Sequence, residues 1–113
     1  MNIFIISTVR NADVDYRLSI ERYVNNLECE GHVVYLPHRD TDQNSNGLNI
    51  CKSNKAALSQ ADEVHIFYRS TSQGTHFDMG MAFALDKKIV IVENEQYGQG
   101  KSFPRMLEEW AVD

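Results

Sequence analysis

The sequence predicts an α/β fold in which helices cover both faces of a parallel sheet, so that the domain is a three-layer sandwich. Two observations lead to this prediction. Short apolar runs alternate with segments of helical periodicity, and successive residues within each run are apolar, as strands buried on both faces require. Because right-handed crossovers allow few arrangements of such strands, we expect four or five strands in the order 2-1-3-4.

The first half of the chain is predicted to contain two strands and two helices. Asp13 can cap the first helix, Gly31 can end it, and Pro37 closes the second strand. A polar loop over residues 38–47 follows, long enough to be functional or mobile. The expected strands cover residues 3–6 and 32–36, and the expected helices cover residues 13–31 and about 49–60.

The second half opens with a predicted βαβ unit from Val64 to Val92. A Gly-rich loop then leads to a last helix that Ser102 can cap, whose apolar stripe is either core or a dimer face. The βαβ unit consists of a strand over 64–68, a polar turn over 69–75, a helix over 76–86 and a strand over 88–92, and the stripe consists of Phe103, Met106, Leu107 and Trp110.

This strand order is that of flavodoxin-like and Rossmann-like folds, which bind ligands at the carboxyl ends of the strands where the order reverses. The loops that leave strands one and three should face each other there. Three of the arginines of this acidic chain, Arg10, Arg39 and Arg69, lie in the loops that meet at this edge. We therefore expect the crevice to bind phosphate or another small anion.

The turn that leads into the third helix suits such an anion. Gly74 lets the backbone approach a ligand closely, and Ser72 and Thr75 offer hydroxyl groups. The start of the helix adds free N–H groups and the positive end of the helix dipole. Asp78 lies one turn into that helix, so an acid and an anion-binding turn share one space.

Composition limits the classes of function. The 113 residues predict a single domain over 1–113, and a net charge of −5 with a pI near 5.3 argues against binding to nucleic acid polymers or anionic membranes. Cys29 and Cys51 show no metal-site spacing and are expected to be reduced, buried thiols. No signal segment or apolar run of membrane-spanning length is recognised, so we expect a cytoplasmic protein.

One run of residues resembles a known family. The pattern Ser72-x-Gly74-Thr75-x-x-Asp78-x-Gly80 is similar to the signature of the nucleoside 2-deoxyribosyltransferases, and Thr8-Val9-Arg10 resembles the first loop of their 2′-deoxynucleoside 5′-monophosphate N-hydrolase branch. The similarity extends over roughly residues 3–92.

The resemblance implies a function and roles for particular residues. The substrate would be a nucleoside or nucleotide whose sugar C1′ is attacked by Asp78, with no cofactor and no metal, in a homodimer. Asn54 stands where the family has an aspartate that helps the base to leave, and Phe4 stands where it has an aromatic hydroxyl. The implied phosphate-binding residues are Thr8, Arg10, Ser72 and Gly74, to which the loop positions add Thr75, Arg39 and Arg69.

Other interpretations stay open at this point. Asp78 also stands where the family has a glutamate, and these three changes at catalytic positions would suit a nucleotide-binding sensor or accessory protein that keeps the phosphate pocket without turnover. Asp78 could merely complete a capping box with Thr75. A metal site in the loop that contains His38 and Asp42 is disfavoured by its spacing. A response-regulator-like or flavin-binding module shares the strand order but lacks their site residues.

Overall fold

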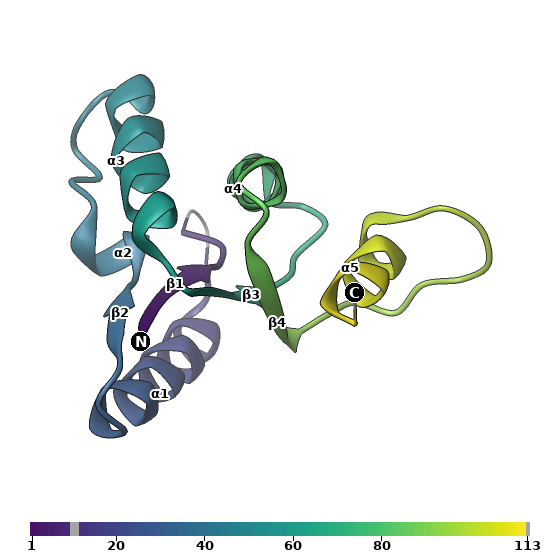
Figure 1. The fold of residues 1–113 in the computed structure, drawn as a ribbon, viewed down its shortest axis with the longest axis horizontal. Helices are drawn as coiled ribbons and strands as arrows, with labels where there is room; N and C mark the ends of the chain where they lie inside the picture. Colours follow the sequence, from purple (N-terminus) through teal and green to yellow (C-terminus); the bar gives the residue numbers. More distant parts are fainter. Residues whose placement is uncertain (10–11, 113) are drawn as a thin grey trace.

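The computed structural model describes residues 1–9 and 12–112, and it contains four strands and five helices in this part of the chain. The strands alternate with the helices almost throughout (Figure 1). In chain order the elements are β1 (Asn2–Ile6), α1 (Val14–Cys29), β2 (Val33–Tyr35), α2 (Pro37–Asp40), α3 (Gly47–Gln60), β3 (Glu63–Phe67), α4 (Gln73–Ala84), β4 (Lys88–Glu93) and α5 (Phe103–Ala111).

The four strands form one parallel sheet in the order β2-β1-β3-β4, which confirms the predicted topology. In the register of β1 with its neighbours, Phe4 pairs with Tyr35 of β2 and with Val64 of β3. The reversal of strand order therefore lies between β1 and β3, as expected, and the loops after these two strands leave the same edge of the sheet.

Alternate side chains of the strands enter two separate cores, because successive residues of a strand point to opposite faces of the sheet. Phe4 and Ile6 of β1 pack with α3, α4 and α5, whereas Ile3 and Ile5 pack with α1. Figure 1 shows α3 and α4 on one side of the sheet, α1 on the other and α5 beyond β4. These four side chains of β1 are at most 1% exposed, so this strand is the centre of the fold.

The helix limits follow from local chemistry that the sequence largely predicts. Asp13 caps α1 by accepting a hydrogen bond from the backbone N–H of Tyr16 at 2.7 Å, and Gly31 after the helix has a φ of +94°. The prediction of one loop over residues 38–47 was wrong in part. Pro37 begins the one-turn helix α2, since proline favours a first helical position, and Asp40 accepts from the backbone N–H of Leu36.

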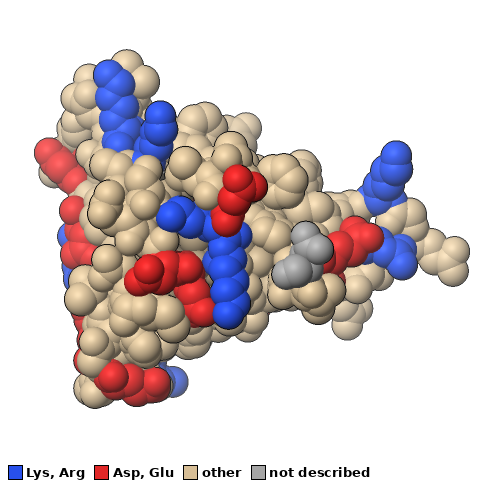
Figure 2. Space-filling model, in the orientation of Figure 1, with Lys and Arg blue, Asp and Glu red and all other residues tan. Residues whose placement is uncertain are grey.

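The apolar stripe of α5 is mainly core. Leu107 is fully buried, and Trp110 packs against the same core while its indole N–H donates to the carbonyl of Lys87 at 3.2 Å. Phe103 is the exception, because it is 55% exposed. Among the described residues, no helix combines the length and apolar character needed to cross a membrane. Figure 2 shows acidic and basic side chains next to one another on the face that it displays.

Candidate active site

A cavity of about 560 Å³ opens at the carboxyl edge of the sheet. Its walls come from the loops after β1 and β3, the start of α1, the connection between β2 and α3, and the first turns of α3 and α4. The size suits a small-molecule ligand. Six of the residues predicted from the sequence to form the site line it: Thr8, Asn54, Arg69, Ser72, Gly74 and Asp78.

The turn before α4 has the features of an anion site. Ser72 is the N-cap, and its Oγ accepts a hydrogen bond from the backbone N–H of Thr75 at 3.1 Å. The hydroxyl proton of Ser72 stays available to a ligand, and the first N–H groups of the helix have no acceptor within the helix. A Cβ built on Gly74 would meet no atom within 4 Å, so the cavity is open in front of this residue.

Two more groups on the cavity wall can bind an anion. Arg69 holds its guanidinium 4.1 Å from the centroid of the Tyr16 ring and 3.7 Å from a carboxylate oxygen of Glu93. Its side chain stays 41% exposed, so it can still reach a ligand. The Oγ1 of Thr8 is buried and has no hydrogen-bond partner among the described residues. Such an atom is costly to bury unless a ligand or water pairs with it.

Asp78 is the acid that α4 contributes to the cavity. Burial raises the pKa of its carboxyl to about 6, and a side-chain hydrogen bond from Asn54 opposes that shift. The capping-box interpretation of Asp78 is wrong, because α4 begins at Gln73 and Ser72 satisfies its N-terminus. The helix starts at residue 73 instead of the predicted residue 76, so Asp78 lies beyond the first turn. Among the described residues, no backbone N–H at the start of α4 donates to its carboxylate, and Asp78 lines the cavity.

Asn54 reaches the cavity from α3 and is only 6% exposed. Its Oδ1 accepts a hydrogen bond from Thr41 Oγ1 at 2.8 Å, and Thr41 Oγ1 lies 2.5 Å from the hydroxyl of Tyr35. A polar side chain that is buried on an otherwise apolar helix face needs such hydrogen-bond partners. Phe4 lies under the network, its ring stacked on that of Tyr35 with centroids 5.5 Å apart.

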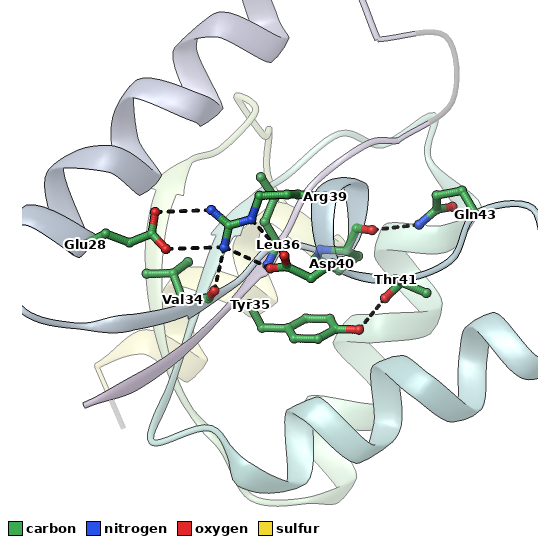
Figure 3. A network of polar contacts seen from close by, with 9 residues as sticks. Glu28, Val34, Tyr35, Leu36, Arg39, Asp40, Thr41 and Gln43 are labelled. Carbon is green, nitrogen blue, oxygen red and sulfur yellow. Dashed lines mark hydrogen bonds and ion pairs between the residues drawn. The ribbon is translucent and has the colours of Figure 1, made fainter.

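Two predicted binding residues lie elsewhere, and a third cannot be placed. Figure 3 shows Arg39 turned toward Glu28 and Asp40, with Nε 2.8 Å from Asp40 Oδ1 and a further hydrogen bond to the carbonyl of Val34. The expectation that Arg39 faces the crevice is therefore not met. Thr75 is 1% exposed and does not line the cavity. Arg10 lies outside the described residues.

Comparison with known proteins identifies the fold. No protein-family model and no curated protein matches the chain. Among solved structures, the CMP N-glycosidase BcmB of Clostridium botulinum matches with a TM-score of 0.67 and 20% identity, over 98% of this chain and 83% of that chain. A 2-deoxyribosyltransferase from Bacillus psychrosaccharolyticus matches with a TM-score of 0.68 and 16% identity, over 87% and 77%. This chain has the 2-deoxyribosyltransferase fold. The Leishmania mexicana enzyme agrees, with a TM-score of 0.66 and 18% identity over 91% and 75%.

Within this 2-deoxyribosyltransferase fold, several cavity residues were not predicted from the sequence. Tyr16, Cys51 and Phe77 line the wall, as does Gln43 from the connection before α3. Helical spacing could have indicated Cys51, which precedes Asn54 by one turn on the same face of α3. The two cysteines are free, as expected, but the prediction of burial was wrong: Cys29 is exposed at the end of α1, and Cys51 is partly exposed to the cavity.

Proposed function

We propose that this protein breaks the N-glycosidic bond of a nucleoside or nucleoside 5′-monophosphate, with Asp78 as the nucleophile. The observation that carries the proposal is a half-buried carboxylate, with its pKa raised to about 6, in the same cavity as the N-terminus of a helix suited to an anion. The fold shared with a CMP N-glycosidase and two 2-deoxyribosyltransferases supports it.

The reaction would take two steps. A carboxylate oxygen of Asp78 attacks C1′ of the sugar as the C1′–N bond breaks, and the bonding electrons leave with the base, which takes up a proton from water. The product is a glycosyl ester on Asp78. A water molecule then attacks C1′, loses a proton to solvent and frees the carboxylate; attack by the nitrogen of a second base would complete a transfer instead. Two displacements at C1′ retain the configuration.

The 5′-phosphate would lie at the start of α4. Ser72 and the backbone of Gly74 would donate hydrogen bonds to it, Arg69 would neutralise its charge, and Thr8 would supply the hydroxyl that has no partner among the described residues. Arg10 remains predicted from the sequence for the same role. The sugar C1′ would then face Asp78, because α4 carries the phosphate site and the nucleophile on one side of the cavity.

A nucleotide-binding sensor or accessory protein is the second candidate, and one observation favours it. Asn54 contacts the nucleophile where the resemblance implies an aspartate, and an amide cannot protonate a leaving base near neutral pH. Asp78 is also one methylene shorter than the glutamate of the resembled family. Such a protein would bind a nucleotide in the cavity and release no base.

Base release separates the two candidates. The protein would be incubated with a panel of nucleosides and nucleoside 5′-monophosphates, and free base would be measured by chromatography. Asp78→Asn should abolish release, a loss of at least about 1000-fold, while nucleotide binding persists. Asp15→Asn, an exposed acid on α1 outside the cavity, is the matched control and should keep full activity. Release that survives Asp78→Asn would refute the nucleophile, whereas binding without release in the wild type would favour the sensor.

The pH dependence gives a second test of the same residue. Only the ionised carboxylate attacks C1′, and burial places the pKa of Asp78 at about 6. The rate of base release should therefore be constant above about pH 7 and fall about tenfold per pH unit below the pKa. A rate that stays flat from pH 7 to pH 4 would contradict an attacking carboxylate with this pKa.

We also propose a homodimer in which α3 and α4 form the interface. Both helices expose large apolar side chains: Leu48 of α3 is 64% exposed, and Phe77 and Phe83 of α4 are 54% and 61% exposed. Phe77 also lines the cavity, so a partner subunit on this face would cover the site. Analytical ultracentrifugation should show a dimer at micromolar concentration and a shift toward monomer in Phe83→Ser. A wild-type monomer at that concentration would refute the dimer.

A further inference from the structure

Three side chains from separate elements form a buried polar chain behind Asp78. Tyr35 comes from the end of β2, Thr41 directly follows α2, and Asn54 comes from α3. Thr41 Oγ1 is 2.5 Å from the hydroxyl of Tyr35 and 2.8 Å from Oδ1 of Asn54. Figure 3 shows the hydroxyl of Tyr35 pointing at Thr41. Thr41 is 7% exposed and does not line the cavity, so a ligand contact does not explain it.

The hydrogen bonds of this polar chain all run in one direction, and Asp78 at its end sets that direction. Asn54 and Asp78 line the same cavity, and because an ionised carboxylate only accepts hydrogen bonds, the NH2 group is the end of Asn54 that can donate to Asp78. Its Oδ1 then faces Thr41 and accepts the proton of that hydroxyl. Since the single hydroxyl proton of Thr41 is used, its oxygen accepts from Tyr35, whose ring is held in place by stacking on Phe4.

We propose that Thr41, supported by Tyr35, is a positioning residue that fixes the Asn54 side chain so that its NH2 group holds the nucleophilic carboxylate of Asp78. The proposal rests on the proposed function only for the role of Asp78 as a nucleophile. The positioning of its carboxylate by Asn54 can be measured without substrate. Without Thr41, the amide of Asn54 would lose the contact that decides which of its ends faces Asp78. Neither Thr41 nor Tyr35 would touch the substrate.

The polar surroundings of Asp78 make this amide important. The other titratable or charged side chains that line the cavity are Asp13 at the start of α1, Arg69 after β3, Cys51 on α3 and Tyr16 on α1. Arg69 is already engaged with Tyr16 and Glu93. Among the described residues, the side-chain hydrogen bond from Asn54 is the cause that lowers the pKa of Asp78 against the effect of burial.

The test compares Thr41→Val, which removes the hydroxyl at nearly constant shape, with Thr41→Ser, which keeps it. The Asp78 carboxyl would be titrated by carbon-detected NMR in protein without ligand. In Thr41→Val the pKa of Asp78 should rise from about 6 to about 7, the shift expected for losing one hydrogen bond to a charged group. Thr41→Ser should titrate like the wild type.

Kinetics give a second readout that a purely structural role would not produce. In Thr41→Val, kcat should fall about fivefold at pH 6, because the ionised fraction of Asp78 falls by that factor when its pKa rises from about 6 to about 7. The acid limb of the pH profile should move up by the same interval as the pKa of Asp78, and KM should stay within about twofold. If the wild type releases no base on any substrate, the proposed function fails while the titration still decides the positioning role.

Tyr35→Phe keeps the proposal testable if Thr41→Val does not fold. It should raise the pKa of Asp78 in the same direction but by less, because Thr41 can still donate to Asn54. Tyr23→Phe is the matched control, since that half-buried phenol also makes a hydrogen bond but belongs to α1, on the other face of the sheet. It should leave the pKa of Asp78 unchanged. An unchanged pKa of Asp78 in folded Thr41→Val, or in Tyr35→Phe if that is the variant that folds, would overturn the proposal.

Discussion

Two chains of buried polar side chains start from a tyrosine and end at a carboxylate, one on each face of the sheet. In the first, Tyr35, Thr41 and Asn54 lead to Asp78 at the carboxyl edge. In the second, Tyr23 lies 2.6 Å from Nδ1 of His65, and Nε2 of His65 lies 3.0 Å from Glu63 at the start of β3. Because the carboxylate only accepts, Nε2 of His65 carries a proton and Nδ1 accepts from Tyr23.

The two carboxylates have opposite pKa shifts. The hydrogen bond from His65 is the largest cause that lowers the pKa of Glu63, and Lys88 adds a second charged contact at 3.4 Å. Burial outweighs the amide of Asn54 and raises the pKa of Asp78 to about 6. A buried carboxylate with enough donors stabilises the fold, whereas one that is short of donors lowers stability and remains available for reaction.

Neutralising each of the two acids should change the free energy of unfolding in opposite directions. The change at Asp78 is the largest expected effect on stability. The folded-state pKa of Asp78 lies above the ordinary value of 3.8, so its charge lowers stability as the pH rises through about 6. Asp78→Asn should therefore raise the free energy of unfolding by about 2–3 kcal/mol at pH 7.5 and by nearly nothing below pH 4. Urea unfolding at the two pH values measures both.

Glu63→Gln is the matched comparison for that experiment. The pKa of Glu63 in the folded protein lies below its ordinary value of 4.5. Ionised Glu63 therefore stabilises the fold above the pKa of the unfolded state, and this stabilisation is lost as the pH falls through the lower pKa of the folded state. The substitution should lower the free energy of unfolding at pH 7.5 by about 1–2 kcal/mol, through weaker bonds to His65 and Lys88. If both variants were destabilised at pH 7.5, Asp78 would be a second structural acid and the contrast would fail.

Asn54→Asp should increase the contrast between the two networks, because it adds a second carboxylate beside Asp78, where hydrogen-bond donors are already few. Two acids that share one site hold a proton between them near neutral pH, and that proton can be given to a leaving base. We expect base release to rise about 10- to 100-fold. Unchanged release, with nucleotide still bound, would favour the sensor, because the cavity would then not be limited by the missing acid.

The sequence predicted the scaffold well because the scaffold depends on local patterns. Apolar runs, Asp13 and Ser102 as caps, and Gly31 as a terminator all act within a few residues of where they are read. That Asn54 and Asp78 share one site was implied by the resemblance and not by a local pattern, and both residues line the cavity.

The remaining site residues depend on contacts between distant segments. Arg39 was expected at the crevice, but Glu28 lies beside it once α1 packs along β2, and the ion pairs turn its side chain away. Tyr16 enters the cavity through its contact with Arg69, a residue 53 positions later in the sequence. Neither of these two contacts leaves a periodic pattern in the sequence. The chain from Tyr35 to Asn54 was hidden for the same reason, since α2 was not predicted.

The smallest expected effect tests the phosphate site itself. Nucleoside 5′-monophosphates should raise the melting temperature more than the matching nucleosides, because only the monophosphates give Arg69 and the start of α4 a charged partner. For tenfold tighter binding at saturation, the difference should be about 5 °C. Arg69→Gln should remove most of it, as Arg10→Ala is predicted to do from the sequence. Arg39→Gln is the matched control, because this arginine lies outside the cavity, and it should keep the full difference. Equal stabilisation by both ligand types in the wild type would show that the cavity has no phosphate site. A different class of ligand would then be needed to explain why Asp78, with so few hydrogen-bond donors, lines this cavity.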